Sequence, residues 1–232
     1  MAAQEKHPHI PARKVLDRIV LGGSDGAIET LAMTAALNGA GLNFQTILLA
    51  GLAFSVAGAL SLFFSNYLSA KAEIDSLRID MERERMEIET EPEEEKGEME
   101  QLLQREGYGK KEIDVIMARL VKDKEMWLRE QLRHELHLHI EDLETDPVSK
   151  SASAGLAFFL LALVALSPYA LRMPHLPALA TSATLSLAAL FILGSKLFTL
   201  RNFTPKAGLE SAAIGALAGG LLYGVGLLFS AI

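Results

Sequence analysis

Residues 19–33 read IVLGGSDGAIETLAM, and this apolar, glycine-containing stretch encloses two carboxylates, Asp25 and Glu29. A step of four residues places both carboxylates on one face of a helix. A charged side chain at the centre of a bilayer costs about 2.5–3.5 kcal/mol on insertion scales, so it normally faces a partner, a cavity or an ion pathway. We therefore predict a membrane helix in which Asp25 and Glu29 bind a divalent cation and carry protons once it leaves. The alternative is that Asp25 caps a glycine-rich break and that Glu29 lies near the membrane surface.

Composition places the chain among membrane proteins. It has 232 residues, of which 50% are hydrophobic, and its mean hydropathy of +0.24 is high for a soluble domain of this length. Residues 71–148 hold 24 of the 29 acidic residues and 13 of the 22 basic ones, so this block carries −11 and the remainder +4. That balance argues against a nucleic-acid partner and for a cationic one. The chain has no cysteine, so a metal site must use oxygen or imidazole ligands.

Five segments are long and apolar enough to cross a bilayer, which takes about 20 helical residues. They are residues 18–41, 44–70, 148–171, 176–200 and 207–232. Basic residues precede the first span, follow the second and flank the loop between the fourth and fifth, whereas the opposite side holds only Arg172. The sequence thus predicts an all-α, polytopic membrane protein with five transmembrane helices, a cytoplasmic N-terminus and an external C-terminus.

The segment between the second and third spans is rich in Glu, Lys, Arg, Leu and Met, a composition typical of helices. We predict three helices there: one that runs to about Thr90, a second that starts at Pro92 and a third over residues 110–143. The predicted organisation is a cytoplasmic N-terminal tail (1–17), transmembrane helices 1 and 2 (18–70), a cytoplasmic acidic helical domain (71–147) and transmembrane helices 3 to 5 (148–232).

Glutamates crowd the middle of this acidic domain, where a run of like charges is most often a solvated surface. Their spacing supports a second interpretation. Glu84 and Glu87 lie three residues apart before Pro92, and Glu95 and Glu98 lie three apart after it, so both pairs converge if the two helices pack side by side. Converging carboxylates repel one another unless cations lie among them, and hard divalent cations accept such oxygen cages. The sequence contains no nucleophile elbow, phosphate loop or Ser/His/Asp arrangement, so we predict no enzymatic activity.

Short motifs in the five predicted spans and in the acidic domain give the chain a resemblance to a known family. They are Gly23-Ser24-Asp25-Gly26, Ala57-Gly58-Ala59-Leu60-Ser61, Tyr67-Leu68-Ser69, the Pro-x-x-Glu-x-x-Glu pattern of Pro92, Glu95 and Glu98, Ser167-Pro168-Tyr169, Leu193-Gly194, Gly208-Leu209-Glu210 and Ile214-Gly215. In their order and spacing these motifs resemble the vacuolar iron transporter family over residues 18–229. The resemblance implies a dimer of five-span subunits that exports cytosolic Fe(II), and often Mn(II), in exchange for protons.

The resemblance also implies which residues bind the metal. In a three-helix cytoplasmic metal-binding domain, the implied ligands are Glu84, Glu87, Glu95, Glu98 and Glu135, and Gln131 stands where the family has a methionine ligand. Asp25 is the implied translocation carboxylate of the first span. The second span departs from the family, because Phe54, Leu62 and Asn66 stand in place of a pathway glutamate, a methionine and a signature glutamate, respectively. We hypothesise that Glu29, which the family pattern does not require, supplies the lost charge.

Taken together, the sequence predicts a homodimeric, proton-coupled exporter of divalent metal, with Fe(II) or Mn(II) as its bound substrate and no organic cofactor. The missing second-span ligands leave two alternatives open: a membrane-anchored metal-binding or sensing module without transport, and a transporter of the same fold for another substrate. Because the sequence carries no organelle address, we expect a prokaryotic cytoplasmic membrane, with a vacuolar membrane as the alternative.

Overall fold

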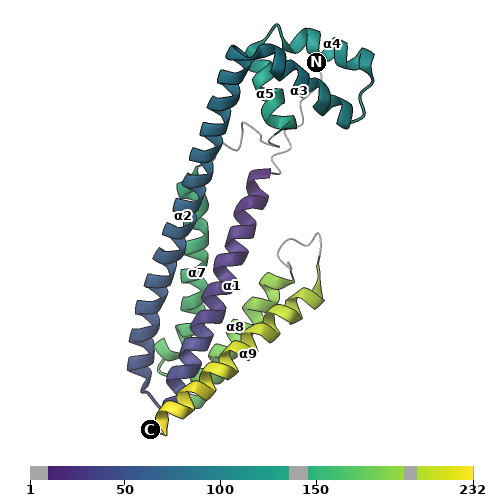
Figure 1. Ribbon diagram of the computed structural model, residues 1–232. Coiled ribbons are helices and arrows are strands. Elements are labelled where there is room, and N and C mark those ends of the chain that lie inside the picture. Colours follow the sequence, from purple (N-terminus) through teal and green to yellow (C-terminus); the bar gives the residue numbers. More distant parts are fainter. Residues whose placement is uncertain (1–9, 136–145, 196–202, 232) are drawn as a thin grey trace, which may run out of the picture. The chain divides into compact units, whose positions relative to one another are not determined.

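The computed structural model describes residues 10–135, 146–195 and 203–231, and within these ranges it consists of helices joined by turns, without a strand (Figure 1). The helices are α1 (Ile10–Gly39), α2 (Phe44–Thr90), α3 (Pro92–Arg105), α4 (Lys110–Leu120), α5 (Lys124–His134), α7 (Pro147–Ala170), α8 (His175–Gly194) and α9 (Pro205–Ser230). The predicted all-α class is therefore confirmed for the described residues. They divide into two compact units, which we call the membrane unit (up to Tyr67 and from Val148 onward) and the acidic unit (Leu68–Pro147).

Four of the described helices are long and apolar enough to cross a membrane, namely α2, α7, α8 and α9. This supports a polytopic membrane protein, and α7 and α9 agree closely with the predicted third and fifth spans. The predicted fourth span corresponds to α8 up to Gly194, and its last residues, 196–200, lie outside the described ranges. Although α1 is also long enough, it is not among the four, because Asp25, Glu29 and several glycines lower its hydropathy.

Two helices extend beyond the predicted boundaries. The first, α1, begins at Ile10 rather than near Arg18, so residues 10–17 of the predicted tail are helical. The second, α2, is a single helix of 47 residues, so the predicted second span and the first predicted helix of the acidic domain are continuous. No glycine or proline lies between Gly58 and Pro92, so nothing in that part of the sequence interrupts the helix.

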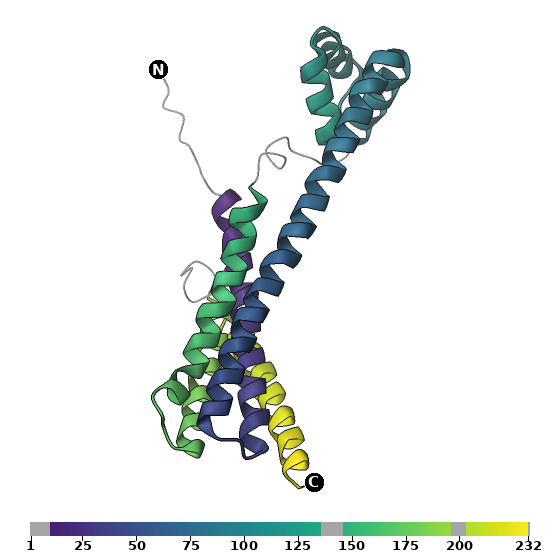
Figure 2. The same cartoon turned by 90° about the vertical axis from the view of Figure 1, so that its left-hand side faces the viewer.

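Close contacts at glycines hold the helices of the membrane unit together. On α1, Gly22 and Gly26 lie against the backbone of Ala154 and Phe158 of α7, where an added Cβ would collide with a carbonyl oxygen. At the other end of α1, the carbonyl of Ala36 lies equally close to Gly226 of α9. Figure 2 shows α7 running beside α1, and Figure 1 shows α8 and α9 lying side by side. Small residues permit this approach, which is how helices commonly associate in membranes.

The acidic unit has a hydrophobic core of its own, formed by α3, α4, α5 and the C-terminal part of α2. Its buried members are Ile88, Met99, Leu103, Ile113, Met117, Leu120, Trp127, Leu128 and Leu132. Pro92 occupies the first turn of α3, where its missing N–H has no helical partner to lose. Because α2 ends at Thr90 and α3 begins at Pro92, the break between the two helices lies between two runs of glutamate.

One prediction for this unit is wrong, because residues 110–134 form two helices rather than one. The chain turns at Val121–Asp123, and α5 restarts at Lys124. Asp123 is the N-cap of α5, and its Oδ1 accepts a hydrogen bond from the backbone N–H of Met126 at 3.1 Å. The turn lets apolar residues of both helices, such as Leu120 and Leu128, reach the same core. The remainder of the predicted third helix, residues 136–143, lies outside the described ranges.

Candidate metal centre

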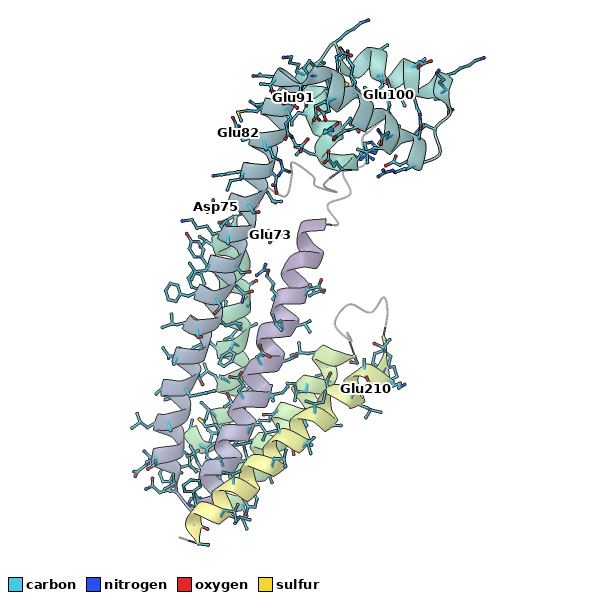
Figure 3. The ribbon with its side chains drawn as sticks, viewed as in Figure 1. Glu73, Asp75, Glu82, Glu91, Glu100 and Glu210 are labelled. Carbon is cyan, nitrogen blue, oxygen red and sulfur yellow. The ribbon has the colours of Figure 1, made fainter. Side chains whose placement is uncertain are left out.

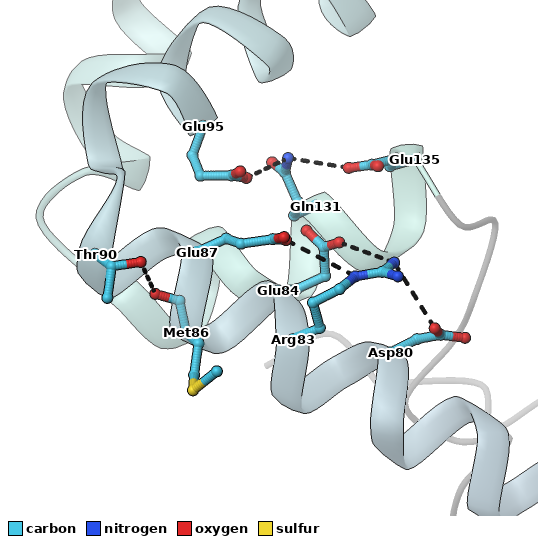
Figure 4. A network of polar contacts seen from close by, with 9 residues as sticks. All are labelled: Asp80, Arg83, Glu84, Met86, Glu87, Thr90, Glu95, Gln131 and Glu135. Carbon is cyan, nitrogen blue, oxygen red and sulfur yellow. Dashed lines mark hydrogen bonds and ion pairs between the residues drawn. The ribbon is translucent and has the colours of Figure 1, made fainter.

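Five of the six predicted metal-binding side chains of the acidic unit point toward one another where α2, α3 and the end of α5 meet (Figure 4). They are Glu84 and Glu87 from α2, Glu95 from α3, and Gln131 and Glu135 from α5 and its C-cap. We call these five residues the carboxylate cluster. The sixth, Glu98, lies on α3 almost one turn beyond Glu95 and is exposed.

Burial distinguishes two glutamates of the cluster, Glu84 and Glu95, from the other glutamates of the acidic run. Glu84 and Glu95 are only 2% and 5% exposed, and Gln131 is fully buried. By contrast, Glu82 on α2, Glu91 between α2 and α3, and Glu100 on α3 are exposed (Figure 3). A solvated surface therefore describes most of the acidic run, but it does not describe Glu84 and Glu95. Carboxylates are almost never fully buried unless they have partners.

Two protein groups contact the carboxylates of the cluster. The Nε2 of Gln131 donates hydrogen bonds to Glu95 Oε2 at 3.0 Å and to Glu135 Oε2 at 3.1 Å. Arg83 forms long ion pairs, at 3.7 Å with Glu84 Oε1 and at 3.9 Å with Glu87 Oε2. Its side chain is 53% exposed, so water and salt weaken these ion pairs. As they stand, no three acidic or histidine side chains in the described ranges are close enough together to hold one ion.

Two buried oxygen atoms within the cluster have no hydrogen-bond partner. They are Oε2 of Glu84 and Oε1 of Gln131. Leaving a buried acceptor unsatisfied costs about 1–3 kcal/mol, and more for a charged group, so each such atom in a folded protein calls for an explanation. A divalent cation would be a suitable partner for atoms of this kind, because hard cations bind both carboxylate and amide oxygens.

Burial and crowding raise the pKa of two carboxyl groups of the cluster to about 7. For Glu84, burial is the larger cause, and the charges of Glu135 and Glu87 follow. For Glu95, burial is again the larger cause, and the charges of Glu84 and Glu98 follow. Although Glu98 is exposed, the pKa of its carboxyl is also raised, by a partial loss of hydration and then by the charge of Glu135. Glu84 and Glu95 therefore exchange protons near neutral pH, where a metal ion and protons compete for the same oxygens.

The sequence reasoning missed one member of this network, Arg83. It follows Asp80 by three residues and precedes Glu87 by four, and it pairs with both side chains. Residues at these separations are neighbours on a helix surface, so the spacing itself was a signal that could have revealed Arg83. Arg83 partly neutralises the side of the cluster formed by α2.

Asp25 and Glu29 lie on α1, in the membrane unit. Asp25 is half-buried within the chain, and Glu29 is exposed. Neither carboxylate forms a hydrogen bond or an ion pair with any residue in the described part of the chain. An ion pair with a basic side chain would have argued against a pathway role. Within the described part of the chain, neither Asp25 nor Glu29 forms one.

The second-span residues that depart from the family pattern contact neighbouring helices. The ring of Phe54 packs against that of Phe158 on α7, with centroids 6.3 Å apart. Asn66 accepts a hydrogen bond from Arg18 Nη1 at 2.7 Å and donates one to the backbone carbonyl of Leu62 at 2.8 Å. An aromatic ring and an amide thus stand where the family pattern has carboxylates, which leaves Asp25 and Glu29 as the acidic side chains between Arg18 and Ala70.

Comparison with known proteins identifies the family. The model of the VIT family matches residues 16–227. The chain is 32% identical to vacuolar iron transporter 1 of Eucalyptus grandis, over 96% of this chain and 89% of that protein. It is 33% identical to vacuolar iron transporter 2 of Oryza sativa subsp. japonica, over 94% and 88%, and 29% identical to a vacuolar iron transporter of Toxoplasma gondii, over 92% and 74%.

The family match and these relatives, which are named as transporters, confirm the predicted resemblance and the prediction of a transporter rather than an enzyme. The family match covers most of the chain, and it includes α1 from its second turn as well as the whole acidic unit. This chain therefore belongs to the VIT family of transporters.

Proposed function

We propose that this protein is a homodimeric transporter that moves divalent metal, Fe(II) and also Mn(II), out of the cytosol in exchange for protons. The observation that carries the proposal is the pair of buried oxygens without partners, Glu84 Oε2 and Gln131 Oε1, among carboxylates that titrate near neutral pH. The names of the relatives, vacuolar iron transporters, support metal as the cargo.

In this proposal the acidic unit lies in the cytosol and collects the ion. The ion binds among Glu84, Glu87, Glu95, Glu98 and Glu135, with Gln131 beside them, and it takes the place of the weakly paired Arg83. It then passes to Asp25 and Glu29. Protons that bind these two acids on the other side of the membrane release the ion, since protons and metal compete for the same oxygens.

The proposal requires α1 to be a fifth span and the active form to be a dimer. An unpaired carboxylate such as Glu29 cannot face lipid without a large cost, so it needs a water-filled path or a partner chain beside it. A second subunit that covers the exposed side of α1 would supply both burial and a second pair of carboxylates. Five spans then place the N-terminus in the cytosol and the C-terminus on the far side.

Export from the cytosol fits either membrane considered from the sequence. In a prokaryotic cytoplasmic membrane the ion would leave the cell, and in a vacuolar membrane it would be stored. The relatives are named for the vacuole, which favours the vacuolar alternative.

The direct test is flux across liposomes that contain the purified full-length protein. With an imposed pH gradient, we expect uptake of Mn(II) and Fe(II) with protons moving in the opposite direction, and a loss of uptake when an ionophore removes the gradient. Metal binding without flux or counter-moving protons would instead support a membrane-anchored metal-binding or sensing module. Phe54 and Asn66 favour that second candidate, because they contribute no carboxylate to the pathway.

A third candidate function is a transporter of the same fold that carries another substrate. If flux of another substrate persists when Glu84→Ala and Glu95→Ala are combined, the cluster does not feed the pathway. Loss of Mn(II) flux in the same double variant, with Asp25 and Glu29 intact, would support the cluster as the collecting site.

A further inference from the structure

Gln131 is the one uncharged member of the carboxylate cluster, and it is more buried than any of the carboxylates around it. Its side chain is fully buried, whereas Glu84 and Glu95 are 2% and 5% exposed. A buried amide normally satisfies both of its ends with hydrogen bonds. In this structure only the nitrogen end is satisfied, by Glu95 and Glu135, and the oxygen end has no partner.

The two hydrogen bonds fix how the amide is turned. Both amide hydrogens are used by carboxylate oxygens, at 3.0 Å and 3.1 Å, so a half-turn of the amide would point its oxygen at two negative charges. The orientation with the nitrogen toward Glu95 and Glu135 is therefore strongly preferred. Oε1 is held in place as an acceptor without a donor, and Glu84 Oε2 is another acceptor of the same kind in the cluster. While Glu84 is ionised, neither atom can satisfy the other, because a carboxylate oxygen and an amide oxygen only accept.

We propose that Gln131 Oε1 is a neutral oxygen ligand that completes an oxygen-only shell with Glu84, and that Gln131 thereby selects hard divalent cations over soft ones. This inference rests on the proposed function, because it assumes that an ion binds in the cluster. Carboxylate and carbonyl oxygens suit Mg(II), Ca(II) and Mn(II), whereas sulfur ligands favour softer ions. Among described residues, the two buried methionines of the acidic unit, Met99 and Met117, belong to its hydrophobic core.

The arrangement also gives Glu95 and Glu135 a second role. Each uses one carboxylate oxygen to hold the Gln131 amide, which leaves the other oxygen of each for an ion. Outer hydrogen bonds of this kind orient a ligand, and their loss typically lowers metal affinity about 10–100-fold. Gln131 thus binds the ion directly, and Glu95 and Glu135 also hold the Gln131 amide in its orientation.

The test measures binding of Mn(II) and of Cd(II), a soft probe, to the full-length protein and to three variants by calorimetry. Gln131→Leu keeps the side chain's approximate size but removes the oxygen, and we expect it to weaken Mn(II) binding about tenfold or more. Gln131→Met offers a thioether, and we expect weaker Mn(II) binding together with unchanged or tighter Cd(II) binding. The preference for Mn(II) over Cd(II) should therefore fall by at least about tenfold. Gln104→Met, at an exposed position of α3, is the matched control and should leave both affinities unchanged.

The outcomes separate this inference from the proposed function. If the unaltered protein binds neither ion, the proposed metal site itself fails. If it binds Mn(II) and loses that binding with Glu84→Gln, yet Gln131→Leu and Gln131→Met bind both ions as the unaltered protein does, the site stands and the role of Gln131 is overturned. Thermal unfolding without metal shows whether each variant is folded. Because methionine is unbranched and similar in length to glutamine, Gln131→Met remains informative even if Gln131→Leu is unstable.

Discussion

The two groups of carboxylates in this protein are held in opposite ways. In the acidic unit, Glu84 and Glu95 are buried, and each is contacted by another side chain: Arg83 pairs with Glu84, and Gln131 donates a hydrogen bond to Glu95. In the membrane unit, Asp25 and Glu29 have no partner within the described part of the chain, and Glu29 is exposed. The acidic unit therefore builds the surroundings of its carboxylates from its own helices. The membrane unit leaves that task to something outside the single chain, which we propose is a second subunit.

The largest expected effect comes from replacing a carboxylate of the membrane unit. Asp25→Asn should abolish Mn(II) flux, because a neutral amide holds a divalent ion more weakly than a carboxylate does and cannot carry a proton across. Binding of Mn(II) to the purified protein should persist, since the cluster is intact. Flux into liposomes and calorimetric binding, measured on the same preparation, separate the two. Glu210→Gln is the control, because Glu210 lies at an exposed position of α9.

Glu29→Gln tests whether Glu29 supplies the charge that the second span lacks. We expect a large loss of flux, although a smaller one than for Asp25→Asn. Compensation by Glu29 would be abandoned if this variant transported as well as the unaltered protein while Asp25→Asn did not.

The next largest effect is expected on metal binding by the acidic unit. Glu84→Gln should weaken Mn(II) binding about tenfold or more, because it removes a buried oxygen charge from the site. The matched control is Glu82→Gln, two residues earlier on the same helix but exposed, which should bind as the unaltered protein does. The Glu84 variant should not be less stable without metal at about pH 8, because its uncharged amide avoids burying a carboxylate. Equal affinities for the two variants would remove Glu84 from the site.

A pH dependence should follow from the raised pKa of Glu84 and Glu95. Both have a folded-state pKa of about 7, against 4.5 for an ordinary glutamate, so the folded protein binds more protons than the unfolded chain between these values. The stability that these groups contribute is complete below about pH 4.5 and is lost as pH rises through about 7. Metal affinity should rise over the same range, because protons leave the ligands.

Two measurements check this pH dependence. Without metal, the difference in unfolding temperature between the unaltered protein and Glu84→Gln should grow, in favour of the variant, from about pH 5 to about pH 8. In calorimetry, Mn(II) binding should release protons near neutral pH. A difference in unfolding temperature that stays constant across this range would contradict the raised pKa of Glu84.

The smallest expected effect concerns helix packing in the membrane unit, which involves no carboxylate. Gly226→Ala should lower stability by about 1–3 kcal/mol, because the new methyl group would meet the carbonyl of Ala36 on α1. Gly224→Ala, on the same helix, meets nothing within 4 Å and should be neutral or slightly stabilising. Thermal unfolding in detergent compares the two. Equal stability of both variants would mean that α1 and α9 are not packed this closely.

Much of the secondary structure could be predicted from the sequence, because spans and helix boundaries depend on local signals. Pro92 begins α3 as predicted, and α7 and α9 follow the apolar segments closely. The predicted single helix over residues 110–143 was wrong at Asp123. Its role as an N-cap depends on how α4 and α5 share one core, which an apolar stripe alone does not reveal. The length of α2 was missed because a change in composition near residue 70 was taken as a boundary, although no helix breaker lies there.

The sequence by itself determined that this protein is helical, that it is built for a membrane, and that its acidity lies in one block, because these properties follow from composition and periodicity. The tertiary structure decided which glutamates matter. Glu84 and Glu95 resemble Glu82 and Glu91 in the sequence, but only the first two are buried. Burial and partners depend on helices that are distant in sequence, such as α2 and α5. For that reason the orphaned oxygens of Glu84 and Gln131, the two hydrogen bonds that hold the Gln131 amide, and the pKa values near 7 emerge only once the chain has folded.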